Sequence, residues 1–305
     1  CQRSRLVAVD TAGDLGWSSS LALGSDGLPI TSYYDGGNRR LKFARCADVH
    51  CQTFETRTLD AGPDVGQHSR LAVGRDGRPV ISYYDQGRGD LKVARCADPG
   101  CTEVAVATVD RVGDLGLHTS IAIGSDGYPV ISYFDASNRD LKVAHCENVT
   151  CTMARASVLD TGGVGLGTAI VVPKDGRPLI VYWDFFNDDL KLARCATVEC
   201  LRADIRVIDQ EGSVGSNAAM ALGADGNPVI SYHDHSHGSL RIAHCADPAC
   251  ERVRVLAADT AGSVGWHTDI AIGADGRPLV SYYDETNGDL KLLRCGDPSC
   301  GAALE

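Results

Sequence analysis

Aromatic and acidic side chains stand side by side at intervals of about fifty residues along this sequence. A flat apolar ring beside a carboxylate suits sugar recognition, because the ring stacks on a pyranose face and the acid accepts hydrogen bonds from hydroxyl groups. Two tryptophans in Gly-rich stretches recur at matching positions. We therefore expect ligand contacts from Trp17, Tyr34, Asp35, Tyr84, Asp85, Phe134, Asp135, Trp183, Asp184, His233, Asp234, Trp266, Tyr283 and Asp284.

The six aspartates among them also have a simpler, structural interpretation. An acid repeated at one strand end in every repeat usually caps a turn by accepting backbone N–H bonds. The alternative is calcium or sugar-hydroxyl binding at six equivalent sites, since Asp135, Asn138 and Asp140 place oxygens at alternating positions, although the full ligand set of an EF-hand is absent. No cofactor is certain, and Ca²⁺ or another divalent metal is the candidate.

Histidines offer a second chemistry. His68, His118 and His267 occupy one position in three repeats, and three imidazoles at a shared mouth could hold a metal with an open coordination position. The simpler interpretation is that they are loop histidines with satisfied hydrogen bonds. A second histidine cluster, suited to a transition metal on an exposed loop, comprises His233, His235 and His237.

These candidates lie in a repeat that covers the whole chain of 305 residues. One copy, VGRDGRPVISYYDQGRGDLKVARCADPGC, begins at Val73, and the repeat occurs six times in edited form. We expect a single domain over residues 1–305, with repeats at approximately 11–60, 61–110, 111–160, 161–209, 210–259 and 260–300. A fixed period of this length is typical of propellers and solenoids.

Each repeat is expected to form four antiparallel strands. In the first repeat, runs rich in apolar and β-branched residues at 19–23, 28–34, 41–46 and 53–59 are separated by turn signals such as Asp26-Gly27, and no segment has a helical period. The second and third strands are apolar on both faces, so neighbouring sheets must cover them. The expectation is an all-β, six-bladed β-propeller with four-stranded blades, with a solenoid as the alternative.

One tyrosine never varies between repeats, which favours packing between blades with its hydroxyl group satisfied. Basic residues in the third strand are expected to pair with nearby acids. The invariant tyrosines are Tyr33, Tyr83, Tyr133, Tyr182, Tyr232 and Tyr282.

The register of the N-terminus predicts how the propeller closes. Residues 2–10 match the fourth strand of a repeat, whereas the sixth repeat ends after its third strand, so we expect this segment to complete the last blade. Cys1 would then lie near Cys295, leaving Cys300 over, although Cys295 could instead bond to Cys300. A lipidated Cys1 is a further alternative.

The remaining cysteines form pairs with four residues between partners. This spacing suits disulfides across a short hairpin loop better than zinc, which would need additional ligands nearby. Such bridges predict an oxidising compartment, and therefore a secreted or cell-surface protein. The pairs are Cys46 with Cys51, Cys96 with Cys101, Cys146 with Cys151, Cys195 with Cys200, and Cys245 with Cys250.

The composition excludes some classes of partner. A formal net charge of −11 disfavours nucleic acid and anionic membranes, because the long-range field would repel both. The sequence contains no apolar run long enough to insert into a membrane. We expect a monomer that binds a glycan or a protein.

The repeat resembles those of bacterial secreted β-propellers, and GSDGLPITSYYD distantly resembles the Asp-box hairpins of sialidase and lectin propellers. The Asp-box spacing and its closing Thr-Trp are absent, and no arginine triad or acid and nucleophile set is matched, so the resemblance implies the fold and not sialidase activity. We expect an exported, non-enzymatic and multivalent glycan-binding module. The alternatives are a metal-dependent hydrolase or lyase with a His-lined central channel, and a protein-interaction scaffold of a larger surface protein.

Overall fold

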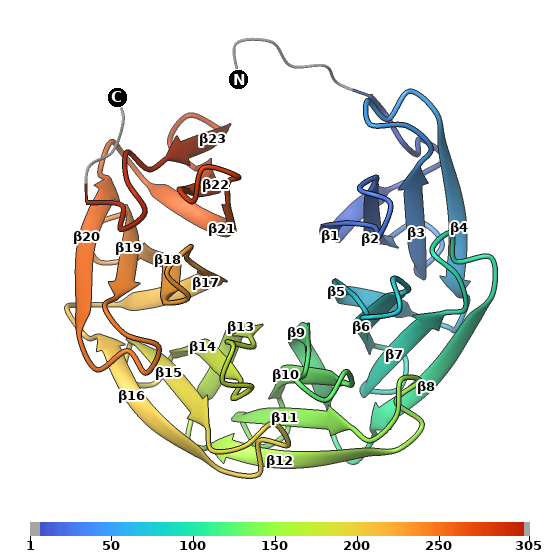
Figure 1. The fold of residues 1–305 in the computed structure, drawn as a ribbon, viewed down its shortest axis with the longest axis horizontal. Helices are drawn as coiled ribbons and strands as arrows, with labels where there is room; N and C mark the ends of the chain where they lie inside the picture. The colour runs from blue at the N-terminus through green and yellow to red at the C-terminus, as the bar shows by residue number, and fades with distance from the viewer. Residues whose placement is uncertain (1–6, 302–305) are drawn as a thin grey trace. The chain divides into compact units, whose positions relative to one another are not determined.

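The computed structural model describes residues 7–301, which form strands, turns and loops. It confirms the expected fold class: the protein is an all-β, six-bladed β-propeller built from antiparallel meanders (Figure 1). Five sheets have four strands each, and the described part of the sixth has three. Between residues 7 and 301 no helix is long and apolar enough to span a membrane.

The strands follow the repeats in chain order. The first sheet holds β1 (Leu15–Leu23), β2 (Pro29–Asp35), β3 (Arg40–Cys46) and β4 (Phe54–Asp60), and the second holds β5 (Val65–Val73), β6 (Pro79–Asp85), β7 (Asp90–Cys96) and β8 (Val104–Asp110). The third and fourth comprise β9 (Leu115–Ile123), β10 (Pro129–Asp135), β11 (Asp140–Cys146), β12 (Ala154–Asp160), β13 (Val164–Val171), β14 (Leu179–Asp184), β15 (Asp189–Cys195) and β16 (Ala203–Asp209). The last two comprise β17 (Val214–Leu222), β18 (Pro228–Asp234), β19 (Ser239–Cys245), β20 (Val253–Asp259), β21 (Val264–Ile272), β22 (Pro278–Asp284) and β23 (Asp289–Arg294).

The first strand of each meander begins earlier than the sequence suggested. In the first repeat we expected the first strand at residues 19–23, but β1 starts at Leu15, with register shifts on either side of Trp17. Such a bulge turns one residue into the left-handed region and re-aims its side chain. The residues at this position, with φ between 51° and 60°, are Ser18, His68, His118, Gly167, Asn217 and His267.

A glycine makes this bulge possible. A Cβ on Gly66 would lie 2.7 Å from the Cα of Leu41, so only glycine lets β5 approach β3 so closely. The bulge carbonyl is then satisfied by the next sheet: the Ser69 hydroxyl donates to the Ser18 carbonyl at 2.8 Å. Backbone strain at the bulge is thus held in place by neighbouring contacts.

The chain divides into two compact units. The first unit runs up to Ile131 and includes Ala144–Arg155, and the second contains Ser132–Val143 and the chain from residue 156 onward. Each has its own apolar core, where consecutive sheets pack face to face: Leu41, Phe43 and Tyr83 are fully or almost fully buried in the first unit. Leu190 and Tyr232 are completely buried in the second.

The invariant tyrosine links consecutive sheets through an aspartate and a lysine. Tyr83 donates its hydroxyl to Asp60 at 2.6 Å, and the Lys92 ammonium reaches the same carboxylate oxygen at 2.5 Å. Burial alone would raise the pKa of Asp60, but the hydrogen bonds from Lys92 and Tyr83 outweigh it and lower that pKa. Tyr182, Tyr232 and Tyr282 make the corresponding bonds to Asp160, Asp209 and Asp259 at 2.7 Å.

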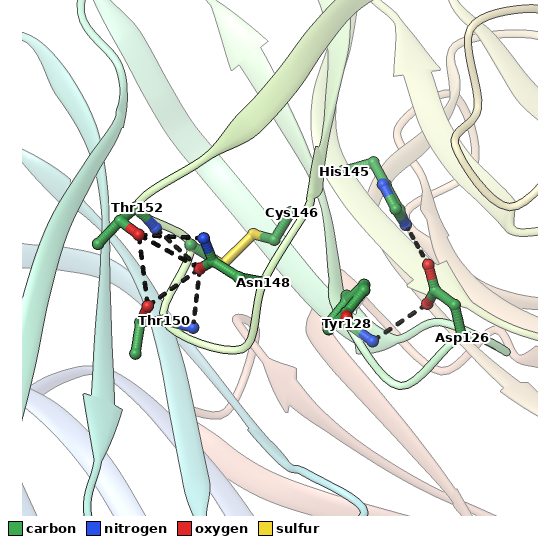
Figure 2. Close-up of a disulfide and its surroundings, with 8 residues drawn as sticks. Asp126, Tyr128, His145, Cys146, Asn148, Thr150 and Thr152 are labelled. Carbon is green, nitrogen blue, oxygen red and sulfur yellow. Dashed lines mark hydrogen bonds and ion pairs between the residues drawn. A yellow bond between two sulfur atoms is a disulfide. The ribbon is translucent and has the colours of Figure 1, made fainter.

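Six disulfides close the loops between the third and fourth strand positions, each with Cα atoms 4.7–4.9 Å apart. Figure 2 shows Cys146 bonded to Cys151, with Asn148 inside the loop accepting the Thr150 and Thr152 backbone N–H groups at 3.2 Å. In the same view the His145 ring contacts Asp126 at 2.8 Å. The loops are therefore braced by covalent bonds and by their own side chains.

The last cysteine pair corrects one expectation. Cys295 bonds to Cys300, with Cα atoms 4.8 Å apart, so Cys300 is not left over and Cys295 is not free for Cys1. The short loop brings these two residues together as it does in the other five repeats, whereas pairing with Cys1 would close a loop of nearly the whole chain at a larger entropic cost.

The predicted closing strand, residues 2–10, lies largely outside the described residues, and residues 7–10 are not assigned to a strand. Asp10 nevertheless accepts hydrogen bonds from Tyr33, at 2.8 Å, and from Lys42. These contacts match those of Asp60 with Tyr83 and Lys92. The end of this segment thus occupies the place of a fourth-strand aspartate, and closure by residues 2–10 stays a prediction.

Candidate functional site

The second unit contains a continuous series of aromatic ring contacts. Neighbouring ring centroids are between 4.3 Å apart, for His233 and Trp266, and 6.4 Å apart, for Trp183 and His235. The rings come from β10, from β14 and β18 with the turns that follow them, and from the start of β21 (Figure 1). We call this set the aromatic row: Phe134, Trp183, Phe185, His233, His235 and Trp266.

Aspartate-capped turns hold the two loop members of the row. Asp184 accepts the backbone N–H groups of Phe186 and Asn187 at 3.2 and 3.0 Å, which fixes the turn that carries Phe185. The next repeat uses His237 in place of the asparagine, and its backbone N–H bonds to Asp234 at 3.1 Å. The carboxylate at each strand end therefore shapes the loop, and the loop presents the ring.

Part of the row is open to solvent. His235 is exposed, whereas Trp183, Phe185 and Trp266 are half-buried. His233 lies beneath them and donates from Nδ1 to the Val264 carbonyl at 2.8 Å. Burial lowers the pKa of His233, so its ring is neutral near pH 7 and stacks on Trp266 as an uncharged aromatic surface.

One polar atom within the row lacks a partner. The indole Nε1 of Trp183 is buried and makes no hydrogen bond among the described residues. Ser213, thirty residues further along the chain, directs its hydroxyl to Asp188 at 2.7 Å. A buried N–H without an acceptor costs about 1–3 kcal/mol, which is unusual in a native protein and often marks a functional position.

Carboxylates lie at the Trp266 end of the row and on the turn that follows Phe185. The Trp266 indole N–H donates to the Ser263 hydroxyl at 3.1 Å, and this hydroxyl donates to Glu285 at 2.8 Å. Neither Glu285 nor Asp188 forms an ion pair within the described part of the chain, unlike Asp234, which binds Arg241 at 2.7 Å. The border of the row thus carries negative charge that no basic side chain of residues 7–301 neutralises by a direct ion pair.

The first unit handles the same positions differently. Tyr34 donates to Asp64 at 2.8 Å and Tyr84 to Asp114 at 2.6 Å, so each polar tip is paired with the next meander. Burial, followed by the bond to Asp114, raises the pKa of Tyr84 and keeps its hydroxyl protonated. Trp17, 62% exposed, bonds through Nε1 to Asp14 at 2.8 Å.

Two of the metal candidates meet in the first unit. The His68 and His118 rings lie with centroids 4.7 Å apart, both on bulge positions. Burial lowers the pKa of His68 to about 3 and that of His118 to about 4, so both rings are neutral near pH 7. His267 is exposed and belongs to the second unit. Within residues 7–301 no three His, Cys, Asp or Glu side chains gather closely enough to hold a metal.

The aspartates that we expected to touch ligand are buried in their own turns. Asp35 accepts the Asn38 backbone N–H at 2.9 Å and its side-chain amide at 3.0 Å. Among all six, no more than 3% of the residue surface is exposed. The geometry favours the turn-capping interpretation for Asp35, Asp85, Asp135, Asp184, Asp234 and Asp284.

Of the paired aromatic residues, only Tyr283 is exposed, at 39%. The structure brings together Phe134, Trp183, His233 and Trp266 from the expected set. In the first unit the Tyr34 and Tyr84 hydroxyls bond to acids, and the Tyr84 ring lies 6.3 Å from the His68 ring. Phe185 was missed as a site residue. The signal was available, because only the fourth repeat has two phenylalanines in this turn.

No protein-family model and no curated protein matches the chain. Solved structures match its fold at low sequence identity. A protein of unknown function from Dyadobacter fermentans has a TM-score of 0.66 at 12% identity, covering 94% of this chain and 95% of its own. The NanB sialidase of Streptococcus pneumoniae has a TM-score of 0.62 at 9% identity, covering 94% and 69%. An α-L-arabinofuranosidase, Arb93A from Fusarium graminearum, has a TM-score of 0.58 at 10% identity, covering 92% and 91%. At these identities the similarity establishes the β-propeller fold alone.

Proposed function

We propose that this protein is an exported carbohydrate-recognition module, and that the aromatic row of the second unit is its sugar-binding surface. The observation that carries the proposal is the run of half-buried rings, Trp183, Phe185 and Trp266, open beside the exposed His235. Half-buried aromatic planes retain an apolar face, which the C–H face of a sugar ring can cover.

Polar groups beside the rings support the same proposal. The Trp183 N–H has no acceptor in the part of the chain that the structure describes, and the Ser263 hydroxyl and Glu285 lie next to Trp266. A sugar hydroxyl can donate to Glu285, and one could accept from the Trp183 N–H once a small movement of that ring exposes the buried nitrogen. A mostly apolar site fixes ligand orientation with few polar contacts of this kind. Two glycan-active enzymes share the fold, which is compatible with this proposal without assigning a reaction.

Disulfides in every repeat support export, because such bridges persist in oxidising compartments. The row occupies one unit, so the proposal is a principal site there instead of six equal sites. Binding without catalysis remains part of the proposal, since no nucleophile motif stands out in the sequence.

Isothermal titration with neutral and amino-sugar oligosaccharides tests the proposal. Trp266→Ala should weaken binding at least about tenfold, equivalent to 1.4 kcal/mol, while the exposed Val112→Ala serves as the surface control. Loss of binding in Trp17→Ala with Trp266→Ala unaffected would move the site to the first unit. No binding to any saccharide by the folded protein would leave the protein-scaffold alternative.

A further inference from the structure

The border of the aromatic row indicates which sugars it would select. We infer that the row prefers glycans that carry free amino groups, such as oligomers of glucosamine, over N-acetylated or acidic ones. This inference rests on the proposed function and adds to it the charge of the ligand. It follows from three features: a carboxylate without an ion pair among the described residues, aromatic faces suited to a cation, and nearby arginine and lysine side chains that are bound to other acids.

The carboxylate is Glu285, which is exposed and accepts only the Ser263 hydroxyl, at 2.8 Å, within the described residues. That hydroxyl is in turn one hydrogen bond from the Trp266 indole. Glu285 also acts electrostatically on His233, whose ring stacks on Trp266. The negative charge is therefore placed at the ring surface that the sugar would cover.

The aromatic faces favour the same charge. An ammonium group over an indole is attracted by the negative face of the ring, with about 0.5–1 kcal/mol at exposed sites. Trp183 and Trp266 flank His235, with ring centroids 6.4 and 4.7 Å from it. An amino sugar seated there could reach an indole face and Glu285 together.

Basic side chains near the row do not compensate this charge. Arg241 is committed to Asp209 at 2.8 Å and to Asp234 at 2.7 Å, and Lys291 to Asp259. The exposed Arg139 lies on the turn after β10, in the repeat that supplies Phe134, the opposite end of the row from Trp266. An anionic sugar would thus meet Glu285 at the Trp266 end and Asp188 on the turn after Phe185, neither of which pairs with a cation between residues 7 and 301.

The test compares three oligosaccharides of equal length: glucosamine, N-acetylglucosamine and galacturonic acid. Titrations are run near pH 6, where the sugar amino groups are protonated and an exposed glutamate is ionised, with the wild-type protein, Glu285→Gln and Glu103→Gln, the last an exposed acid in the loop before β8. The expected affinity order is amino, then acetylated, then acidic, and Glu285→Gln should reduce the preference for the amino form by about three- to fivefold, the effect of one exposed charge contact. Raising the salt concentration should shrink the same preference.

Equal or tighter binding of the acetylated or acidic oligomer would overturn this inference and leave sugar recognition standing. An amino preference that survives Glu285→Gln unchanged, or that Glu103→Gln reduces equally, would overturn it as well by assigning the preference to overall charge. If none of the three oligomers binds, both this inference and the proposed function fail.

Discussion

The two units differ in the contacts of the aromatic residue that ends the second strand of each repeat. Where the first unit ends a second strand with Tyr34 or Tyr84, the next Gly-rich segment supplies Asp64 or Asp114 as the acceptor. Thirty residues after Trp183 the second unit has Ser213, whose hydroxyl is already directed to Asp188. In the first unit the tyrosine hydroxyls therefore form hydrogen bonds between consecutive meanders. In the second unit the ring surfaces are partly exposed, and the Trp183 indole N–H has no acceptor among the described residues.

This difference shows why near-identical repeats need not be equivalent sites. The scaffold contacts, Tyr83 with Asp60 and Tyr232 with Asp209, are the same in both units. What changes is a pair of positions in contact across meanders, one on a strand end and one in a Gly-rich segment. Where the first unit has a tyrosine bonded to an aspartate of the next meander, the second unit has Trp183 or His233, whose rings join the aromatic row.

The largest expected change in stability concerns the sixth sheet, whose described part has three strands. Leu290 is 83% exposed on β23, whereas its equivalents Leu41 and Leu240 are fully buried. The pairing of Ile242 with Leu256 predicts that Leu292 pairs with Val7 once residues 2–10 complete this sheet. A Val7→Cys, Leu292→Cys bridge in a Cys1→Ser background should stabilise the protein by up to about 5 kcal/mol, because it closes a very long loop.

Oxidation yield and thermal unfolding of the monomer measure this cross-link. Ala8→Cys with Leu292→Cys is the matched control, since a shift of one residue turns the side chain to the other face. Equal yields from both pairs, or a covalent dimer as the main product, would refute the closure.

The next largest expected change is in the free energy of unfolding when the aspartate that bonds to both a tyrosine and a lysine is removed from either unit. Asp60→Ala leaves the Lys92 ammonium, whose side chain is 8% exposed, without its nearest acid and should cost about 3–5 kcal/mol. Asp259→Ala should cost less, because the Lys291 side chain is 33% exposed and water can replace the acid. Denaturant unfolding of both variants checks the order, and an equal loss would mean that burial does not govern this contact.

The histidine pair should give the first unit a pH dependence. His68 and His118 bind protons less readily in the folded state than in the unfolded chain, where the pKa is near 6.5. Their contribution is therefore complete above about pH 6.5 and declines as the pH falls towards 4, by at most about 1.4 kcal/mol per pH unit for each histidine.

Replacing both with asparagine, the residue that the fifth repeat has at this bulge, should flatten that part of the stability curve. Unfolding free energies measured across this pH interval test the prediction. A wild-type curve that is already flat would contradict it.

The smallest effect tests the difference between the units directly. Tyr84→Phe removes the bond to Asp114 and should destabilise the protein by about 1 kcal/mol.

Ser213→Asn should give the Trp183 N–H an acceptor while its own amide donates to Asp188, raising stability by a similar amount and weakening sugar binding. If Ser213→Asn binds sugar as well as the wild type, the unpartnered indole N–H has no part in recognition.

The sequence by itself determined the number of blades, the four-strand meander, five of the disulfides and the structural role of the invariant tyrosines. These follow from local patterns, such as strand alternation, Asp-Gly turns and cysteine spacing, which repeat six times and therefore reinforce each other. The Cys295–Cys300 bond obeys the same local rule, although the register of Cys1 pointed elsewhere.

Only the tertiary structure decided which of the recurring aromatic residues face one another. Tyr84 and Trp183 occupy the same position in the repeat, but Tyr84 bonds to Asp114, thirty positions later, whereas Ser213, thirty positions after Trp183, directs its hydroxyl to Asp188. A single-repeat pattern does not contain that pairing, because the side chains meet only when consecutive sheets pack. The buried carboxylates, the unpaired indole and the aromatic row are consequences of that packing, and the candidate site depends on them.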